Sequence, residues 1–464
     1  MFDKNIYISR RKKLKELVGD GLILIIGNSE SPMSYADNAY NFIQDSTFLY
    51  YFGLNSPDLI GVIDIENDKE YIFGKEFTID DIIWMGQQKT FKERAAEVGI
   101  EKFVESEKLE EVLEKAKLKK QIIHFTNQYR IENSLKISKL LDFNLDDVNK
   151  KFSKKLVAGI IEMRNLKKDY EITELEKATN VTREMHLTAM KNVKPGMKGY
   201  ELVALLEAAA KKYNATTSFH TICTTNGQIL HNHFHGNTFK EGDVVLLDCG
   251  ARLENGYCGD MTTVFPVSGK FDSRQKDIYS LLIEMFDRAE ECTKPGVTNK
   301  FVHLEVCKVL TKGMIKRGIM KGNVDEIVNA GAHALFFPHG LGHMIGLDVH
   351  DMENFGENNV GYDEITKRET QFGLKSLRMG KELKLGYVLT IEPGIYFIPE
   401  LIERWKKEGK FEEYINYEEV KKYLDFGGMR YEGDFLITEN GNKRLGDKMP
   451  KYFDEIEEIL KNNN

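Results

Sequence analysis

The stretch Val244–Val267, VVLLDCGARLENGYCGDMTTVFPV, contains two apolar runs separated by an Asn-Gly pair at 255–256. An Asn-Gly pair between strand-like segments predicts a β-hairpin, here with a three-residue loop whose glycine has positive φ. In that register Asp248 lies opposite Thr262, and Asp260 lies two residues along the partner strand on the same face. Diagonal neighbours of this kind are roughly 7–8 Å apart at Cα. The hairpin therefore predicts a carboxylate pair that can share metal ions.

Three further motifs place a charged or polar side chain beside an apolar strand or on a glycine-rich turn. They contain His343 in FPHGLGHMIGLDVHD, Glu392 in YVLTIEPGIYF and Glu432 in GGMRYEGDFLIT. A charge in such a segment needs a specific partner, because burying it alone is costly. With Asp248 and Asp260 the set comprises four carboxylates and one imidazole. These are ligands suited to two divalent ions such as Mn²⁺.

The composition is typical of a globular chain with more than one domain. The 464 residues are 41% hydrophobic and 30% charged, which allows a large core. The net charge of -8 argues against a nucleic-acid partner, and basic runs such as Arg11–Lys13 are expected on solvated helix faces. No apolar run reaches the roughly 18 residues of a membrane helix, so no membrane partner is expected. The five cysteines show no CxxC spacing, which is typical of reduced thiols in a cytoplasmic protein.

The chain predicts two domains that meet at a polar segment near residue 152. Residues 1–152 alternate short apolar strands with charged helical stretches, which indicates an α/β domain with a mixed or parallel sheet. Residues 153–464 begin with a long helical pattern and continue with helices and strands, so the fold class is α/β (α+β). The charged stretches Ile365–Lys384 and Glu400–Lys422 are expected to be surface insertions. Met429–Thr438 is expected to form one strand.

The motifs quoted above resemble those of the pita-bread dinuclear metallopeptidases, in particular the aminopeptidase P and prolidase (Xaa-Pro peptidase) group. YADNAYNFIQDSTFLYYFGLNSPDLIGVID resembles the amino-terminal, creatinase-like domain of these enzymes, and EMRNLKKDYEITELEKA begins the likeness to their catalytic domain. The resemblance covers essentially the whole chain. It implies a creatinase/aminopeptidase P-like domain at residues 1–152 and a pita-bread catalytic domain at 153–464. It also implies two bound divalent ions, Mn²⁺ first, with Co²⁺, Zn²⁺ and Fe²⁺ as alternatives.

The resemblance assigns a role to each candidate ligand. Asp248 would chelate one ion, while His343 and Glu392 would hold the other. Asp260 and Glu432 would bridge both ions. Glu392 would in addition carry a proton to and from water and the leaving nitrogen, as a general base and acid.

Other residues match positions at which the family contacts its substrate. His231 and His350 correspond to histidines beside the substrate carbonyl, where they would stabilise the developing oxyanion. The neighbouring His233 fits the family's spacing less well than His231 does. Beyond the scissile bond, the residues implied to bind substrate are His339, Arg430 and Tyr396.

The motifs predict an Xaa-Pro aminopeptidase, which removes the first residue of a peptide that has proline in second position. The nearest alternative is an Xaa-Pro dipeptidase (prolidase), whose pocket must offer a cation to the free carboxylate of the proline. Creatinase-like chemistry without metal and a non-catalytic binding protein on the same fold are remote alternatives. Retention of all five ligands argues against both. The amino-terminal likeness favours the aminopeptidase, with a pocket open to a continuing chain.

Two departures from the family pattern affect the surroundings of the site. The Asp248–Asp260 interval is one residue longer than usual, and Gly433 stands where the family has an acid, followed by Asp434. Neither departure removes a ligand. The resemblance also implies a homodimer or homotetramer, in which Trp84 would reach the cleft of a neighbouring subunit.

Overall fold

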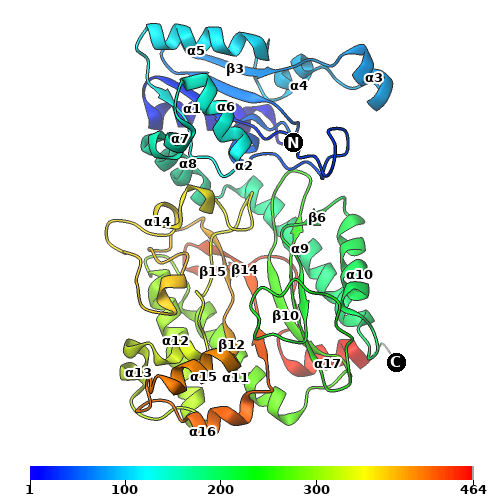
Figure 1. Ribbon diagram of the computed structural model, residues 1–464, viewed down its shortest axis with the longest axis vertical. Helices are drawn as coiled ribbons and strands as arrows, with labels where there is room; N and C mark the ends of the chain where they lie inside the picture. Colours follow the sequence, from blue (N-terminus) through cyan, green and yellow to red (C-terminus); the bar gives the residue numbers. More distant parts are fainter. Residues whose placement is uncertain (462–464) are drawn as a thin grey trace. The chain divides into compact units, whose positions relative to one another are not determined.

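Two units make up the part of the chain that the computed structural model describes, residues 1–461 (Figure 1). Unit 1 comprises Met1–Arg164 and Met352–Gly356, and unit 2 comprises Asn165–Asp351 and the chain from Glu357 onward. The polar asparagine tail at 462–464 lies outside the described residues. Within residues 1–461, no helix is both long enough and apolar enough to span a membrane.

Unit 1 is built on a mixed sheet with the strand order β4-β3-β2-β1-β5. The β1–β2 and β2–β3 pairs are antiparallel, and the β1–β5 and β3–β4 pairs are parallel. The expected α/β domain with a mixed sheet is therefore confirmed. The strands are β1 (Leu22–Ile26), β2 (Ile60–Asp64), β3 (Lys69–Gly74), β4 (Lys102–Glu105) and β5 (Ile123–His124). The helices are α1 (Lys4–Val18), α2 (Ser46–Phe52), α3 (Ile79–Met85), α4 (Phe91–Glu97), α5 (Leu109–Leu118), α6 (Ile131–Leu141), α7 (Leu145–Lys151) and α8 (Lys154–Asn165), with 3-10 turns η1 (Ser106–Lys108) and η3 (Glu353–Phe355).

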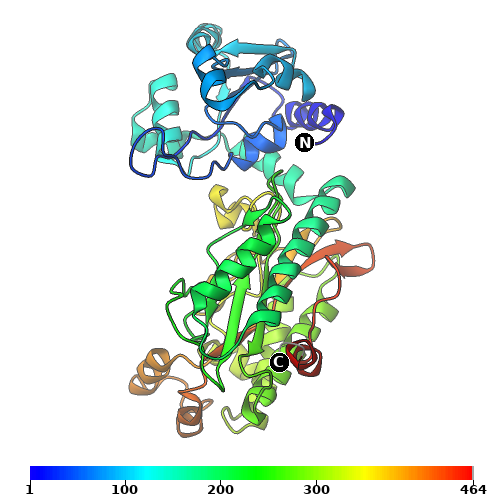
Figure 2. The ribbon, with the colours of Figure 1, turned by 90° about the vertical axis from the view of Figure 1, so that its right-hand side faces the viewer.

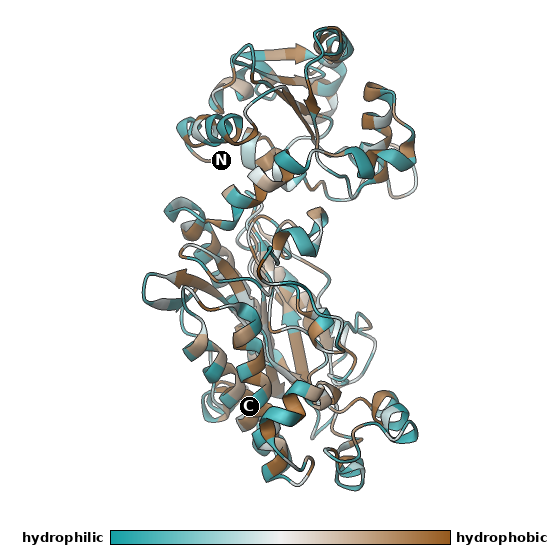
Figure 3. Ribbon diagram, turned by 90° about the vertical axis from the view of Figure 1, so that its left-hand side faces the viewer, coloured by the Kyte–Doolittle hydropathy of each residue, from teal (hydrophilic) through white to brown (hydrophobic). Residues whose placement is uncertain are grey.

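The central strands of unit 1 are apolar because helices cover both faces of the sheet. One face packs against α5 and α6 through a buried cluster that includes Leu24, Leu113 and Ile137. On the other face the Phe52 ring of α2 lies so close to Gly61 that a Cβ there would be 2.1 Å from it. Figure 3 shows the result as brown strands at the centre of this unit, with teal on the outer surfaces of its helices.

Unit 2 combines long helices with several small sheets. Its sheets have the orders β10-β8-β7, β11-β14-β15, β12-β13 and β6-β9. Figure 2 shows α9 and α10 lying together across the strands β8 and β10. The strands are β6 (Thr216–Thr217), β7 (Ile222–Thr224), β8 (Val244–Cys249), β9 (Ala251–Arg252), β10 (Met261–Pro266), β11 (Val388–Ile391), β12 (Gly394–Tyr396), β13 (Gly428–Arg430), β14 (Gly433–Thr438) and β15 (Gly441–Arg444). The helices are α9 (Asp169–Asn192), α10 (Gly199–Lys211), α11 (Ser273–Cys292), α12 (Asn299–Lys316), α13 (Val324–Ala330), α14 (Glu357–Val360), α15 (Pro399–Lys407), α16 (Tyr417–Val420) and α17 (Phe453–Lys461), with 3-10 turns η2 (Ala332–Leu335), η4 (Leu374–Ser376) and η5 (Lys421–Tyr423).

The hairpin predicted from the sequence forms with the expected register. β8 and β10 pair antiparallel, and Asp248 lies opposite Thr262. At the turn, the Leu253 amide donates to the Tyr257 carbonyl at 2.9 Å, and Gly256 has a φ of 94°. The glycine supplies a left-handed conformation that a residue with a Cβ adopts only with strain.

The expectation of one strand over Met429–Thr438 is wrong, because the segment changes partners. β13 pairs with β12, whereas β14 pairs with β11 and β15. Tyr431 and Glu432 lie between the two strands, outside either ladder. The alternation of side chains is thus interrupted at the residue that carries a candidate ligand.

The expectation that Arg11 lies on a solvated helix face is also wrong. The Arg11 side chain is fully buried, and its Nε lies 2.7 Å from a carboxylate oxygen of Glu70 on β3. Its remaining nitrogens donate to the carbonyls of Tyr51, Val98 and Gly99 at 2.9–3.1 Å. Burial lowers the pKa of Arg11, and the Glu70 charge opposes that shift. One arginine therefore joins α1 to three other segments of unit 1.

We expect Arg11→Ala to destabilise unit 1 by about 3 kcal/mol, because three buried carbonyls lose their donor and the half-buried Glu70 carboxylate keeps only its contact with Lys15. The measurement is hydrogen exchange of the β1 amides as a function of urea, which reports the unfolding free energy of this unit. Lys12→Ala is the matched control, since Lys12 is exposed on the same helix. Equal effects of the two substitutions would contradict the structural role of Arg11.

Candidate active site

The hairpin positions Asp248 and Asp260 on one face, and both side chains are buried. Asp434 at the start of β14 holds the backbone beside this pair. Its Oδ2 accepts the Asp260 amide at 3.1 Å and the Thr179 hydroxyl at 2.9 Å. Asp434, which follows the glycine that replaces the family's usual acid, therefore anchors the loop that carries Asp260.

His343 lies on the glycine-rich turn that runs beside β11. Its amide donates to the Thr390 hydroxyl at 3.1 Å, and the Thr390 amide donates to its carbonyl at 2.9 Å. Gly342 permits this approach, since a Cβ there would lie 2.0 Å from the Thr390 carbonyl oxygen. Nδ1 lies 3.1 Å from the Met344 carbonyl and must carry the ring proton. That bond leaves the Nε2 lone pair for a metal ion.

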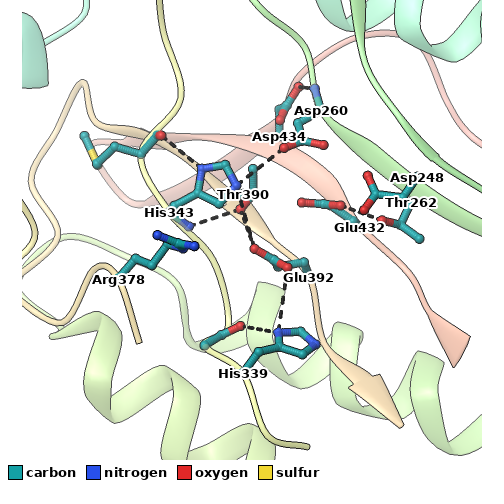
Figure 4. A network of polar contacts seen from close by, with 12 residues as sticks. Asp248, Asp260, Thr262, His339, His343, Arg378, Thr390, Glu392, Glu432 and Asp434 are labelled. Carbon is teal, nitrogen blue, oxygen red and sulfur yellow. Dashed lines mark hydrogen bonds and ion pairs between the residues drawn. The ribbon is translucent and has the colours of Figure 1, made fainter. Parts of the chain in front are cut away.

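Glu392 and Glu432 complete the group of five (Figure 4). His343 Nε2 lies 3.4 Å from Asp260 Oδ2 and 3.7 Å from Glu392 Oε1. Glu432 accepts the Thr262 hydroxyl at 2.7 Å, and its amide donates to the Thr262 carbonyl at 3.0 Å. One ligand atom each from Asp260, His343 and Glu432 lies within 4.8 Å of the other two. The structure thus brings together all five residues that the sequence singled out.

Burial and mutual repulsion disfavour the charged form of the acids in this group. Burial raises the pKa of Glu392 and that of Asp434 to about 7. Burial first, and then repulsion from Asp260 and Glu392, raises the pKa of Glu432 well above its usual value. Burial also raises the pKa of Asp260, whose Oδ1 has no hydrogen-bond donor among residues 1–461. Buried, mutually repelling hard oxygen ligands beside an imidazole fit bound divalent cations.

Arg430 is the centre of a directional hydrogen-bond chain behind the acids. Its Nη2 pairs with Asp248, its Nε donates to Thr262 at 3.0 Å, and its Nη1 donates to the Tyr396 hydroxyl at 2.8 Å. That hydroxyl lies 2.8 Å from His339 Nε2, while His339 Nδ1 lies 2.8 Å from the Gly340 carbonyl. The carbonyl requires a proton on Nδ1, so the Tyr396 hydroxyl donates to Nε2.

A cavity of about 550 Å³ opens onto the five residues. His231, His339 and His350 line it, as expected, and His233 and Val349 line it as well. The His350 ring stacks on the His343 ring, with centroids 3.7 Å apart. Tyr396 was expected to bind substrate, but it is fully buried and does not line the cavity. Its hydroxyl positions His339 and Arg430 instead.

Several residues of the site were missed by the sequence analysis. Ser376 and Arg378 line the cavity, although Ile365–Lys384 was expected to be a surface insertion. The expectation is wrong for this part of the stretch, because Arg378 is half-buried and its Nη1 lies 3.0 Å from a carboxylate oxygen of Glu357. Thr262 was noted only as the partner of Asp248. Its position opposite Asp248 in the predicted hairpin could have indicated that its hydroxyl contacts the carboxylates of the site.

The chain matches known peptidases over nearly its full length. The family described as "Metallopeptidase family M24" matches residues 173–439, which is more than half of the chain. This chain belongs to that family. The model described as "Aminopeptidase P, N-terminal domain" matches residues 7–124. The family resemblance and the fold expected from the motifs are therefore confirmed.

Individual relatives include both kinds of proline-directed peptidase. An Xaa-Pro dipeptidase of Homo sapiens is 30% identical over 466 residues, covering 97% of this chain and 91% of its own. An Xaa-Pro aminopeptidase of Escherichia coli (strain K12) is 28% identical, covering 97% and 96%. The solved structure of zinc-substituted E. coli aminopeptidase P in complex with product has a TM-score of 0.80 and 27% identity, covering 100% and 99%.

The protein is accordingly a metallopeptidase, which removes the non-catalytic alternative. Membership of the M24 family implies a site for two divalent metal ions. The buried acids fit such ions, because bound cations would offset the repulsion between their charges. A cation would also give a partner to Asp260 Oδ1, which has no hydrogen-bond donor among residues 1–461.

We expect Thr262→Val to weaken divalent-metal binding by about 10- to 100-fold, since Glu432 loses a donor and Arg430 an acceptor. A competition titration against a fluorescent chelator measures this. Thr263→Val is the control, because Thr263 faces the other side of β10 and its hydroxyl lies 2.8 Å from His186 Nδ1. An equal loss of affinity in both variants would mean that the effect comes from strand stability.

Proposed function

We propose that this protein hydrolyses the peptide bond between an N-terminal residue and a proline in second position. The observation that carries the proposal is the cavity of about 550 Å³ in which five metal-type ligands, four of them buried, lie together with His231 and His350. The relatives named Xaa-Pro dipeptidase and Xaa-Pro aminopeptidase support the choice of substrate. Proline makes a tertiary amide without an N–H, so a peptidase that recognises the substrate N–H loses a contact there.

We assign the metal ligands as the resemblance implies. Asp248 would hold one ion, His343 and Glu392 would hold the other, and Asp260 and Glu432 would contribute to both. We propose Mn²⁺, because the set is rich in hard carboxylate oxygens and contains no thiolate. Two such ions supply Lewis acidity and lower the pKa of a bound water.

Glu392 is the member of the group best placed to move a proton. Its side chain is 19% exposed, against 6% for Asp260 and 3% for His343, so it faces the cavity. Its Oε2 lies 3.8 Å from His339 Nδ1, and the Gly340 carbonyl already accepts that proton. The Glu392 carboxylate is therefore free to take a proton from water and to deliver it to the proline nitrogen.

His231 and His350 act on the substrate carbonyl in this assignment. Burial, followed by the charge of Arg430, lowers the pKa of His231, so its ring is neutral at pH 7 and donates through a single N–H. His350 is held against His343 by ring stacking and lies beside Val349 on the cavity wall. The two imidazoles approach the carbonyl as oxyanion donors, and Val349 offers an apolar contact to the proline ring.

His339 and Arg430 have a positioning role and line the pocket beyond the scissile bond. Burial and the Arg430 charge lower the pKa of His339 to about 3, so it stays neutral across physiological pH. Tyr396 fixes both groups from behind through its hydroxyl. The pocket that receives the proline therefore keeps one charge state and one hydrogen-bond direction.

Peptide length separates two candidate functions. The Xaa-Pro aminopeptidase is favoured by the sequence and is supported by the match to the E. coli enzyme over 96% of that protein. The Xaa-Pro dipeptidase is favoured by Arg378, whose charge lies close enough to lower the pKa of both His231 and His339. A guanidinium tethered by Glu357 on the cavity wall suits a free prolyl carboxylate. On this geometry we propose that Xaa-Pro dipeptides are the preferred substrates.

Kinetics of Gly-Pro and of a Gly-Pro-Xaa tripeptide, measured side by side with the Mn²⁺-loaded protein, test the preference. We expect kcat/KM to be higher for Gly-Pro. Arg378→Ala should raise KM for Gly-Pro by about 10- to 100-fold, the loss expected for a charge-assisted bond. Arg368→Ala is the matched control. Arg368 pairs with the same Glu357 at 2.8 Å and is equally exposed, but it does not line the cavity.

Cleavage of the tripeptide at least as fast as Gly-Pro, with no effect of Arg378→Ala on their ratio, would establish the aminopeptidase instead. Failure to cleave either peptide would contradict the proline-directed function as a whole.

We expect Asp260→Ala to lose both metal ions and nearly all activity, because this carboxylate bridges the two sites. Metal analysis of the purified variant is the direct measurement. His233→Ala should retain both ions, since His233 is exposed at the cavity wall. Two tightly held ions in Asp260→Ala would exclude the bridging role.

We further propose a cytoplasmic homodimer or homotetramer. Five buried free cysteines support a reducing compartment. Trp84 on α3 is 86% exposed beside Ile83, which supports a contact with another subunit. Sedimentation of the wild type as a monomer at micromolar concentration would contradict the oligomer.

A further inference from the structure

A second cluster of metal-type ligands lies in unit 2, apart from the cavity. It consists of His303, Cys307 and His333, all three fully buried. One donor atom of each lies within 4.8 Å of the other two. None of the three lines the cavity, and no step of the proposed peptidase reaction uses them.

Local structure explains how the three side chains meet. His303 and Cys307 are four residues apart on α12, so they lie on the same face of the helix, one turn apart. His333 lies in η2, which begins directly after Gly331 with its φ of 84°. Gly331, in its left-handed conformation, ends α13 and turns the chain so that the His333 ring in η2 packs against α12.

The imidazoles of this cluster lack the hydrogen bonds that buried polar groups normally make. His303 Nε2 lies 3.5 Å from Cys307 Sγ. Within residues 1–461, His303 Nδ1 and both ring nitrogens of His333 have no well-formed hydrogen bond, although the Ile327 carbonyl raises the pKa of His333 slightly. A buried polar atom without a hydrogen bond destabilises the fold, because it has lost its contact with water. Among the described residues, one ring nitrogen of each histidine therefore lacks a hydrogen-bond partner beside a thiol, which indicates that a ligand belongs between them.

The charge states of the cluster suit metal binding. Burial lowers the pKa of His303 to about 3 and that of His333 to about 4, so both rings are neutral and each keeps a lone pair. Burial also raises the pKa of the Cys307 thiol. The thiol therefore stays protonated until an ion takes the place of its proton.

We propose that His303, Cys307 and His333 form a buried site for a thiophilic d¹⁰ cation, and that Cu⁺ is the ion it selects. Binding breaks the Cys307 S–H bond, forms a sulfur–copper bond and releases the proton to solvent. The two imidazoles add one lone pair each, and the Ile327 carbonyl is placed to accept the remaining N–H of His333.

Charge balance favours Cu⁺ over Zn²⁺. One thiolate neutralises Cu⁺, whereas Zn²⁺ would leave a net positive charge in a fully buried site. No carboxylate is near enough to contribute to the pKa shift of either histidine. The cluster offers three donors, while structural Zn²⁺ sites are almost always four-coordinate. The hard carboxylates of the active site prefer Mn²⁺ to Cu⁺, so they do not compete with the Cys307 thiolate for copper.

The test uses the full chain, produced in medium containing manganese and copper and purified without oxygen. Metal analysis should find one equivalent of copper in addition to Mn²⁺, with a copper–thiolate absorption band in the ultraviolet. Cys307→Ser and His333→Phe, which nearly preserve side-chain size, should each lose that equivalent and keep the Mn²⁺. Cys292→Ser, which changes another buried thiol at the end of α11, should keep both.

X-ray absorption at the copper edge of the wild type gives a second measurement that needs no variant. One sulfur and two nitrogen neighbours are expected. Absence of copper from the wild type, or copper retained equally by Cys307→Ser, would overturn the site. Zinc found there in place of copper would overturn the selection of Cu⁺.

Discussion

Mutual repulsion among buried carboxylates is the constraint on which unit 2 depends. Asp248, Asp260 and Glu432 are buried and Glu392 is largely so, and burial raises the pKa of the last three. Such a group is stabilised by protons or by cations, since Coulomb repulsion between close charges grows as the dielectric falls. Arg430 supplies one positive charge against Asp248. Bound divalent ions would supply the rest, so the fold and the proposed chemistry of this unit share one electrostatic requirement.

The scaffold meets that requirement by placing three of the five residues just outside a strand end, Asp248 in the hairpin ladder and His343 on the adjoining turn. Asp248 lies in β8, Glu392 directly follows β11, and Glu432 lies in the gap between β13 and β14. Strand ends expose side chains without breaking a hydrogen-bond ladder. Backbone contacts then fix the spacing, as where Thr390 pairs with His343 across a glycine. Precision of this kind is what a two-ion site needs from its protein.

The residues that could be predicted are those whose position is set by neighbours in sequence. The Asn-Gly turn defines the pairing of Asp248 with Thr262 locally, and the motifs around His343 and Glu432 carry a family resemblance. The burial of Arg11 depends on carbonyls 40 to 88 residues away, and no local pattern reveals it. Arg378 was hidden for the same reason, because a charged stretch looks alike whether it faces solvent or a cavity. The break after Arg430 arises from a change of partner strands, which alternation alone does not encode.

The gap at Tyr431 and Glu432 has a consequence for folding as well as for catalysis. Glu432 reaches across to Thr262 on β10, so residues 170 positions apart in sequence meet at the ligand set. Ions held jointly by the early hairpin and the late strands, as proposed above, would close that long loop, much as a disulfide does. Assembly of unit 2 and capture of its ions would then be coupled. Such coupling would leave chains without metal more exposed to proteolysis than metal-loaded chains, because ligand binding stabilises the folded state.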